Sequence, residues 1–124
     1  MASLLRARWL HVTFAFLAMG GWALFANRGH EGAWLAALTQ GLASAVITFV
    51  LKGVLDRMGG RFTSWRAFVL PPLSTATAVL IALWVAHTGI GTPNVLATIA
   101  VPWSVSTLYA ILYAADVERR NDRA

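Results

Sequence analysis

Long, mainly apolar runs of residues alternate with short polar links along the chain. A helix needs about 17 to 25 mainly apolar residues to cross a hydrocarbon core of about 30 Å. Four runs reach that length, and they predict transmembrane helices over residues 9–26, 33–55, 67–86 and 95–115. The chain is therefore expected to be an all-α integral membrane protein, with a single four-helix transmembrane domain over residues 1–124 built from two helical hairpins.

The residues between and within these helices predict where they begin and bend. Glycine, which favours turns, occurs in all three links. Thr92 and Pro93 predict the N-cap and the first turn of the fourth helix. Pro71, Pro72 and Pro102 fall inside the third and fourth helices. We expect them to kink these helices and to leave freed carbonyls facing protein or a wet cavity, because an unsatisfied carbonyl in lipid is costly.

Polar side chains recur at helical spacing inside two of the predicted helices. In the second helix they lie four residues apart from Gln40 to Asp56, a stripe that slowly winds round the helix, and a similar line follows the fourth helix. If both face inward, they form a cleft open to the cytoplasm, with the expected substrate-facing residues Gln40, Ser44, Thr48, Ser106, Tyr109 and Tyr113. The same side chains can instead hold helices together by hydrogen bonds. The sequence leaves both interpretations open.

Small residues at four-residue spacing form ridges on the predicted helices. Ala37, Gly41 and Ala45 make one such ridge on the second helix, and the first helix offers the pair Gly20 and Gly21. Small side chains let membrane helices approach closely, since lipid provides no hydrophobic drive for their association. The ridges therefore favour close packing, either within one chain or between copies.

Composition agrees with a chain that faces lipid. Hydrophobic residues make up 58% of the chain and charged residues only 12%, whereas ordinary soluble domains have about 25% charged residues. This balance excludes a soluble enzyme and a disordered regulator. Because the chain has no cysteine, a disulfide-stapled domain and a zinc ribbon are excluded as well.

The distribution of charge predicts an orientation. Nine of the ten lysine and arginine residues lie on one side of the predicted membrane, and only Arg28 lies on the other. Cytoplasmic loops carry the excess of basic residues, so both termini and the link between the hairpins are predicted to be cytoplasmic. At this interface we expect contacts with lipid headgroups from Lys52, Arg57, Arg61, Arg66, Trp9 and Trp65. This topology explains the net charge of +5, so no nucleic-acid partner is expected.

No motif in the sequence indicates catalysis or metal binding. The chain has no GxSxG or HExxH motif and no acidic residue within the apolar part of a predicted helix. His30, His87 and Glu31 lie in or beside the two links predicted to face the outer side, residues 27–32 and 87–94, but without metal-ligand spacing. We therefore expect no enzyme activity, no cofactor and no metal. The missing ionisable group at depth also counts against a proton-coupled exporter.

Two functional hypotheses fit this sequence. The first is an uncoupled translocator of a lipid-linked or amphipathic solute, acting as a homo-oligomer through a groove lined by the polar stripes. The second is an accessory or assembly subunit of a larger membrane complex, in which the small-residue ridges dock on a partner. The alanine- and arginine-rich composition favours a bacterial inner membrane as the location.

Overall fold

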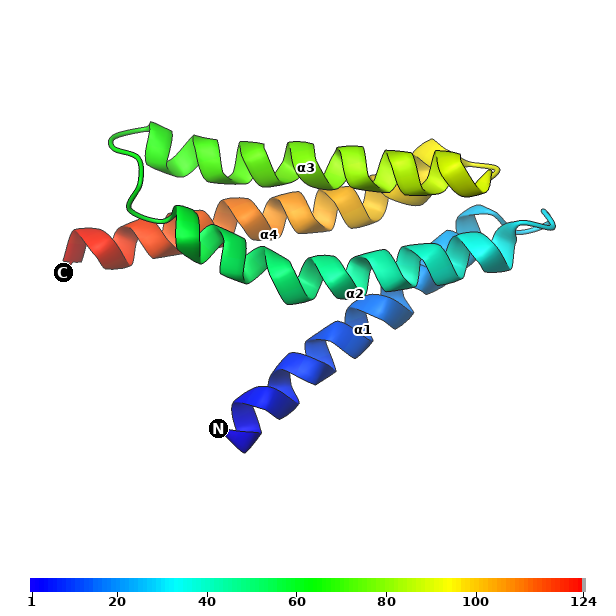
Figure 1. Cartoon of the computed structure of the whole chain (residues 1–124), viewed down its shortest axis with the longest axis horizontal. Helices are drawn as coiled ribbons and strands as arrows, with labels where there is room; N and C mark the ends of the chain where they lie inside the picture. Colours follow the sequence, from blue (N-terminus) through cyan, green and yellow to red (C-terminus); the bar gives the residue numbers. More distant parts are fainter. Residues whose placement is uncertain (124) are drawn as a thin grey trace.

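The computed structural model describes residues 1–123, which form four α-helices and contain no β-strand (Figure 1). The helices are α1 (Ala2–Ala26), α2 (Ala33–Met58), α3 (Arg66–Ile90) and α4 (Val95–Arg123). Each one is long and apolar enough to cross a membrane. The prediction of an all-helical chain with four such helices is confirmed.

The helices extend beyond the apolar runs at the charged ends of the chain. α1 begins at Ala2, before the run that starts at Trp9, and α4 continues to Arg123, past the predicted end at Ala115. Alanine, leucine, arginine and glutamate are good helix formers, so the polar ends remain helical where hydropathy has already fallen. An exposed ion pair between Asp116 and Arg120, 3.2 Å apart and one turn from each other, supports the end of α4.

Helices α2 and α4 form the centre of the molecule. Consecutive helices pair as antiparallel hairpins, α1 with α2 and α3 with α4, and α2 contacts both helices of the second hairpin. In the part of the chain that the structure describes, α1 contacts α4 but not α3. Figure 1 shows α1 crossing α2 and diverging from the bundle toward the N-terminus. The fold is therefore a three-helix bundle with a fourth helix splayed across it.

Glycines allow the close crossing of α1 and α2. A Cβ atom built on Gly20 would lie 3.0 Å from the backbone oxygen of Ala37, and one built on Gly41 would lie 3.1 Å from the backbone oxygen of Phe16. Larger side chains would push the helices apart at this point. The ridge of small residues on α2 is thus used within the chain, against α1.

Apolar packing inside the bundle is divided between two small clusters. Leu51 and Leu55 of α2 pack on Ala110 of α4, and Val79 and Leu83 of α3 pack with residues of α4 that include Ile99. Large apolar side chains elsewhere point outward, among them Phe14, Leu17, Trp34, Leu96 and Leu108. A small buried core with an apolar outer surface is the arrangement expected of helices that face lipid.

The turn before α4 differs from the sequence prediction. α4 begins at Val95, and its first backbone hydrogen bond runs from the Thr98 amide to the carbonyl of Asn94. Thr92 therefore does not cap the helix. Its hydroxyl instead contacts the ring of His87, and the chain reaches Thr92 through Gly91, whose φ of 75° lies in the left-handed region that glycine adopts most easily. The prediction of Thr92 as the N-cap of α4 was wrong, because the Thr92 hydroxyl bonds to His87 at the end of α3.

Both proline-containing helices are continuous through their prolines. Near the start of α3, the hydroxyl of Thr75 donates to the carbonyls of Pro71 and Pro72, at 3.1 and 3.2 Å. Deeper in the bundle, the Trp103 indole donates to the carbonyl of Ala76 at 2.9 Å and so joins α4 to α3. Side chains thus bond to backbone carbonyls in and after the proline-containing turn.

Candidate functional site

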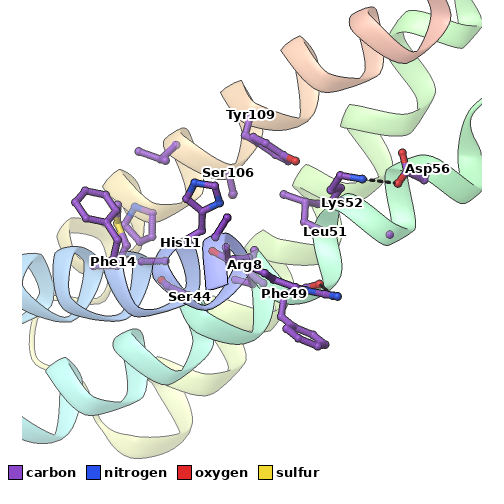
Figure 2. Close-up of a pocket in the computed structure, with 18 of the residues that line it drawn as sticks. Arg8, His11, Phe14, Ser44, Phe49, Leu51, Lys52, Asp56, Ser106 and Tyr109 are labelled. Atoms are coloured by element: carbon purple, nitrogen blue, oxygen red, sulfur yellow. Dashed lines mark hydrogen bonds and ion pairs between the residues drawn. The ribbon is translucent and has the colours of Figure 1, made fainter. Parts of the chain in front are cut away.

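A groove of about 790 Å³ lies between the N-terminal half of α1, the C-terminal half of α2 and the middle of α4 (Figure 2). It exists because α1 leaves the bundle after its crossing with α2, and the space between the diverging helices is not filled by side chains. In Figure 2 the side chains of His11, Ser106 and Tyr109, which come from two different helices, point into this space.

One end of the groove is charged. Arg8 and His11 of α1 lie there together with Lys52 and Asp56 of α2. Lys52 Nζ is 3.0 Å from Asp56 Oδ2, and the other carboxylate oxygen accepts a hydrogen bond of 2.5 Å from the Tyr113 hydroxyl. Both oxygens of this carboxylate therefore have partners, and its charge is balanced by the neighbouring ammonium group.

Arg8 ties the two diverging helices together at the same end. Its Nη2 atom donates to the carbonyl of Phe49 at 3.0 Å, and its guanidinium carbon lies 3.8 Å from the centre of the Phe49 ring. Trp9 also contacts this ring, with 6.3 Å between ring centres. A cation above an aromatic face is attracted to its quadrupole, so Phe49 anchors the arginine in a defined position.

The opposite end of the groove is apolar. It is walled by Phe14, Ala15 and Met19 of α1, with Pro102 of α4 beside them. Ile47, Leu51 and Val105 continue this surface toward the charged end. The groove is therefore amphipathic along its length, with ionised groups at one end and hydrocarbon walls at the other.

Four of the six predicted substrate-facing residues line this groove: Ser44, Thr48, Ser106 and Tyr109. Tyr113 lies beside it, stacked on Tyr109 with 5.6 Å between ring centres. The Ser106 hydroxyl donates to the carbonyl of Trp103, one turn earlier, and Ser44 accepts from Gln40. The two polar stripes thus meet across one hollow, and several of their hydroxyls also make local hydrogen bonds.

Gln40, the sixth predicted residue, lies inside the bundle and not along the groove. Its side chain is 0% exposed. The amide nitrogen donates to Ser44 Oγ at 2.8 Å, and the amide oxygen accepts from His87 Nε2 at 2.8 Å. Because an amide oxygen can only accept, His87 Nε2 carries the proton and His87 Nδ1 accepts from the Thr92 hydroxyl at 2.7 Å. These contacts join α2 to α3 and to the turn before α4.

A second polar network ties α1 to the start of α4. The side-chain amide of Asn27 donates to Thr98 Oγ1 at 2.6 Å, and its oxygen accepts from the Asn94 backbone amide at 2.8 Å. Asn27 and Thr98 are both 0% exposed. Together with the Gln40–His87 contact, this network holds the α1–α2 link against the α3–α4 link.

The residues predicted to contact headgroups lie at the surface near the same end of the molecule. Arg57, Arg61 and Arg66 are exposed, as are Trp9 and Trp65. Arg61 donates to the backbone carbonyl of Arg57 at 2.6 Å, and the guanidinium of Arg66 lies 5.8 Å from the centre of the Trp65 ring. Lys52 is exposed as well, and it also lines the groove.

Sequence reasoning missed the contribution of α1 to the groove. Arg8, His11 and Phe14 are not among the predicted substrate-facing residues, because that prediction rests on the polar stripes of the second and fourth helices. The sequence did contain a signal for this wall of the groove. Arg8 precedes His11 by about one turn, and aromatic and small residues follow them. In the same way, His87 had been placed beside an outer link, whereas it is fully buried and bonded on both ring nitrogens.

Within residues 1–123, no group of three or more histidine, aspartate or glutamate side chains is placed to hold a metal ion. A smaller hollow of about 260 Å³ lies at the ends of α2 and α4, between Asp56, Gly59, Val117, Arg120 and Asn121. The chain matches no protein-family model, and comparison with curated proteins and with solved structures gives no match.

Proposed function

We propose that this chain is a small integral membrane protein that moves a lipid-linked or amphipathic solute across a bacterial inner membrane without ion coupling. In this proposal all four helices span the bilayer, and both termini and the α2–α3 link are cytoplasmic. The chain acts as a homo-oligomer and catalyses no chemical reaction. Nine of its ten basic residues lie toward the proposed cytoplasmic side.

The observation that carries this proposal is the amphipathic groove between α1, α2 and α4. Its charged end suits a headgroup and its apolar end suits a hydrocarbon chain. Lining side chains such as Leu4 and Phe14 are exposed, and α1 diverges from α2 on this side (Figure 1), so an amphiphile can enter the groove sideways from the bilayer. A path of this kind lowers the cost of carrying a polar headgroup through hydrocarbon, because the headgroup meets hydroxyls and charges on the way.

The absence of ion coupling follows from where the charges lie. Asp56 is the only acidic side chain along the groove in the part of the chain that the structure describes, and it sits at the charged end, bonded to Lys52 and Tyr113. Proton-coupled transporters use ionisable groups at depth. A solute moved by this groove would therefore follow its own gradient.

The proposed oligomer follows from the openness of the groove. α1 packs closely on the bundle at its crossing with α2 and from there to its C-terminal end. Residues 1–11 are all exposed, and Arg8 and Trp9 contact Phe49. A second copy placed against this side would close the groove into a continuous path. Four helices alone leave it open to lipid.

One observation favours the alternative, an accessory or assembly subunit. The first part of α1 carries several large apolar side chains that are more than half exposed: Leu4, Leu5 and Leu10. A different membrane protein that covers this segment would explain its exposure without a substrate. In that case the chain expressed alone is expected to be monomeric or unstable.

Reconstitution into liposomes tests the proposed function. Tail-labelled phospholipids in the inner leaflet are protected from a membrane-impermeant reductant, so their loss of fluorescence measures movement across the bilayer. We expect the protein to speed this loss, and we expect Ala15→Trp, which fills the apolar end of the groove, to slow it at least about tenfold, as a barrier increase of about 1.4 kcal/mol would.

Leu17→Trp provides the matched control, because Leu17 lies on the same helix, is 66% exposed and does not line the groove. This variant should move lipid at the parent rate. Light scattering of the purified protein measures its mass in parallel. A monomer that moves no lipid would contradict the translocator and favour the accessory subunit.

A further inference from the structure

We propose that the groove selects a lipid with an anionic, phosphate-bearing headgroup, and that Arg8 holds that headgroup. This inference rests on the proposed function, since it names the class of amphiphile that enters the same groove. It concerns the charged end of the groove, which is lined by Arg8, His11, Lys52 and Asp56. Figure 2 shows Arg8 beside Phe49 and Lys52 bonded to Asp56.

Arg8 is positioned by the protein but its charge is not neutralised. A single hydrogen bond to the Phe49 carbonyl and the contact with the Phe49 ring hold the guanidinium in place. A guanidinium has five N–H donors, so four remain for a ligand. Among residues 1–123, no carboxylate lies within 4.0 Å of Arg8. The side chain is therefore an oriented cation with donors to spare.

Lys52 does not play the same part, because its charge is already balanced. Its ammonium group is 3.0 Å from Asp56, whose second oxygen accepts from Tyr113. Two cations and one carboxylate line this end of the groove, so the formal net charge there is +1, and Arg8 is the member without an acidic partner. His11 adds a ring that can donate a hydrogen bond.

This charge arrangement discriminates between headgroups. A phosphate offers two oxygens to the fork of a guanidinium and so forms paired, charge-assisted hydrogen bonds. A zwitterionic headgroup carries an ammonium group as well, and the only carboxylate nearby is Asp56, which is occupied on both oxygens. An anionic headgroup therefore gains the arginine contact without placing a third cation beside Arg8 and Lys52.

The length of the groove fits a lipid whose headgroup lies at Arg8. Ala15 is seven residues further along α1, which corresponds to about 10 Å at 1.5 Å per residue. Phe14, Ala15 and Met19 form the apolar wall beyond that point. An acyl chain attached to a phosphate at Arg8 would run along this wall toward the deep end of the groove.

Binding of two lipids that differ only in headgroup tests the inference. Full-length protein in detergent micelles is titrated with tail-labelled phosphatidylglycerol and, separately, with phosphatidylcholine carrying the same tails, and fluorescence anisotropy reports binding. We expect phosphatidylglycerol to bind at least about tenfold more tightly, as for a hydrogen bond between charged groups. Arg8→Gln should reduce this preference to less than about twofold.

Arg28→Gln is the matched control, because Arg28 also donates to a backbone carbonyl and lies over a phenylalanine ring, but lies outside the groove. It should keep the full preference for phosphatidylglycerol. Equal binding of both lipids by the unaltered protein would overturn the inference without any variant having to fold. An equal loss of preference in Arg8→Gln and Arg28→Gln would also overturn it, since general surface charge would then be the cause.

Two further arms separate the possible explanations. Inorganic phosphate at millimolar concentration should not displace labelled phosphatidylglycerol, and complete displacement would mean a site for a soluble anion instead of a lipid. In the liposome assay, equal and rapid movement of both lipids would leave the proposed translocation intact and overturn only the headgroup selectivity. If the unaltered protein binds phosphatidylglycerol selectively but moves neither lipid across the bilayer, the proposed translocation is contradicted.

Discussion

Gln40 and His87 form an interhelical hydrogen bond in which both side chains are fully buried. The amide oxygen of Gln40 can only accept, so the neutral imidazole donates from Nε2 and accepts at Nδ1 from Thr92. Every polar atom of the pair thus has a partner. Away from water, a group that loses its partner bears the full cost of desolvation.

Replacing Gln40 should expose this dependence. We expect Gln40→Leu to lower the free energy of unfolding by about 1–3 kcal/mol, because His87 keeps a buried N–H without an acceptor. Reversible unfolding in mixed micelles with a denaturing detergent, followed by tryptophan fluorescence, measures this change. The variant should still move lipid when folded, since Gln40 does not line the groove.

A double-mutant cycle with His87→Leu supplies the control. The double variant should be more stable than the sum of the two single losses implies, by about 0.5–3 kcal/mol, because it removes both polar partners together. Additive losses would show that the two side chains act independently and would contradict the hydrogen bond as the source of stability.

The difference between Gln40 and its neighbours on the stripe could not be predicted from spacing alone. An α-helix turns once every 3.6 residues, so a four-residue spacing rotates the stripe by about 40° at each step. From Gln40 to Asp56 the direction changes by about 160°. The beginning of the stripe therefore faces α3, whereas Thr48, Lys52 and Asp56 face the groove. Which sector faces which helix depends on the packing.

At the scale of the helices, the crossing of α1 and α2 determines that a groove exists. The two backbones approach most closely at Gly20 and Gly41, where any Cβ atom would lie 3.0 to 3.1 Å from the opposite backbone oxygen. From this crossing toward the N-terminus, α1 diverges from α2, as Figure 1 shows. On that side Arg8 contacts α2 through the carbonyl and the ring of Phe49. The crossing is thus the point about which α1 is held.

A large side chain at the crossing should separate the two helices. We expect Gly20→Leu to destabilise the protein by about 1–3 kcal/mol, as overpacking of a close contact does. Gly21→Leu is the matched control on the same helix, because a Cβ atom there meets nothing within 4 Å. It should be neutral or slightly stabilising, since leucine is a better helix former than glycine.

The same unfolding titration measures both variants. Cross-linking of cysteines introduced at Trp9 and Phe49, whose ring centres lie 6.3 Å apart, would report the separation of α1 from α2, and it should fall in Gly20→Leu only. Equal stability and equal cross-linking in the two variants would contradict a close crossing at Gly20.

The sequence predicted the number of helices but not this crossing. Four apolar runs of membrane length are visible because lipid requires each of them to be long and nearly uncharged. Ridges of small residues, in contrast, occur on all four helices, so they allow many pairings and specify none. The groove depends on which ridge α1 meets and at what angle, and that depends on all contacts of α2 together, including Phe16 on Gly41 and Arg8 on Phe49.

For the molecule as a whole, the fold gathers charge at one end. Both termini and the α2–α3 link lie toward one end, and the α1–α2 and α3–α4 links lie toward the other (Figure 1). Nine of the ten basic residues belong to the first end, and Arg28 belongs to the second. Because positively charged segments stay in the cytoplasm during insertion, the proposed orientation places the charged end of the groove at the cytoplasmic leaflet.

Cysteine labelling can determine this orientation, because the chain contains no cysteine of its own. We would introduce a single cysteine at His30, in the α1–α2 link, or at Thr63, in the α2–α3 link, and both positions are exposed. In intact bacterial spheroplasts, a membrane-impermeant maleimide should label His30→Cys and should label Thr63→Cys only after the membrane is opened. The reverse pattern would place the charged end of the groove outside. Labelling of both positions in intact cells would mean that α2 does not cross the membrane, and the groove would then have no bilayer to open into.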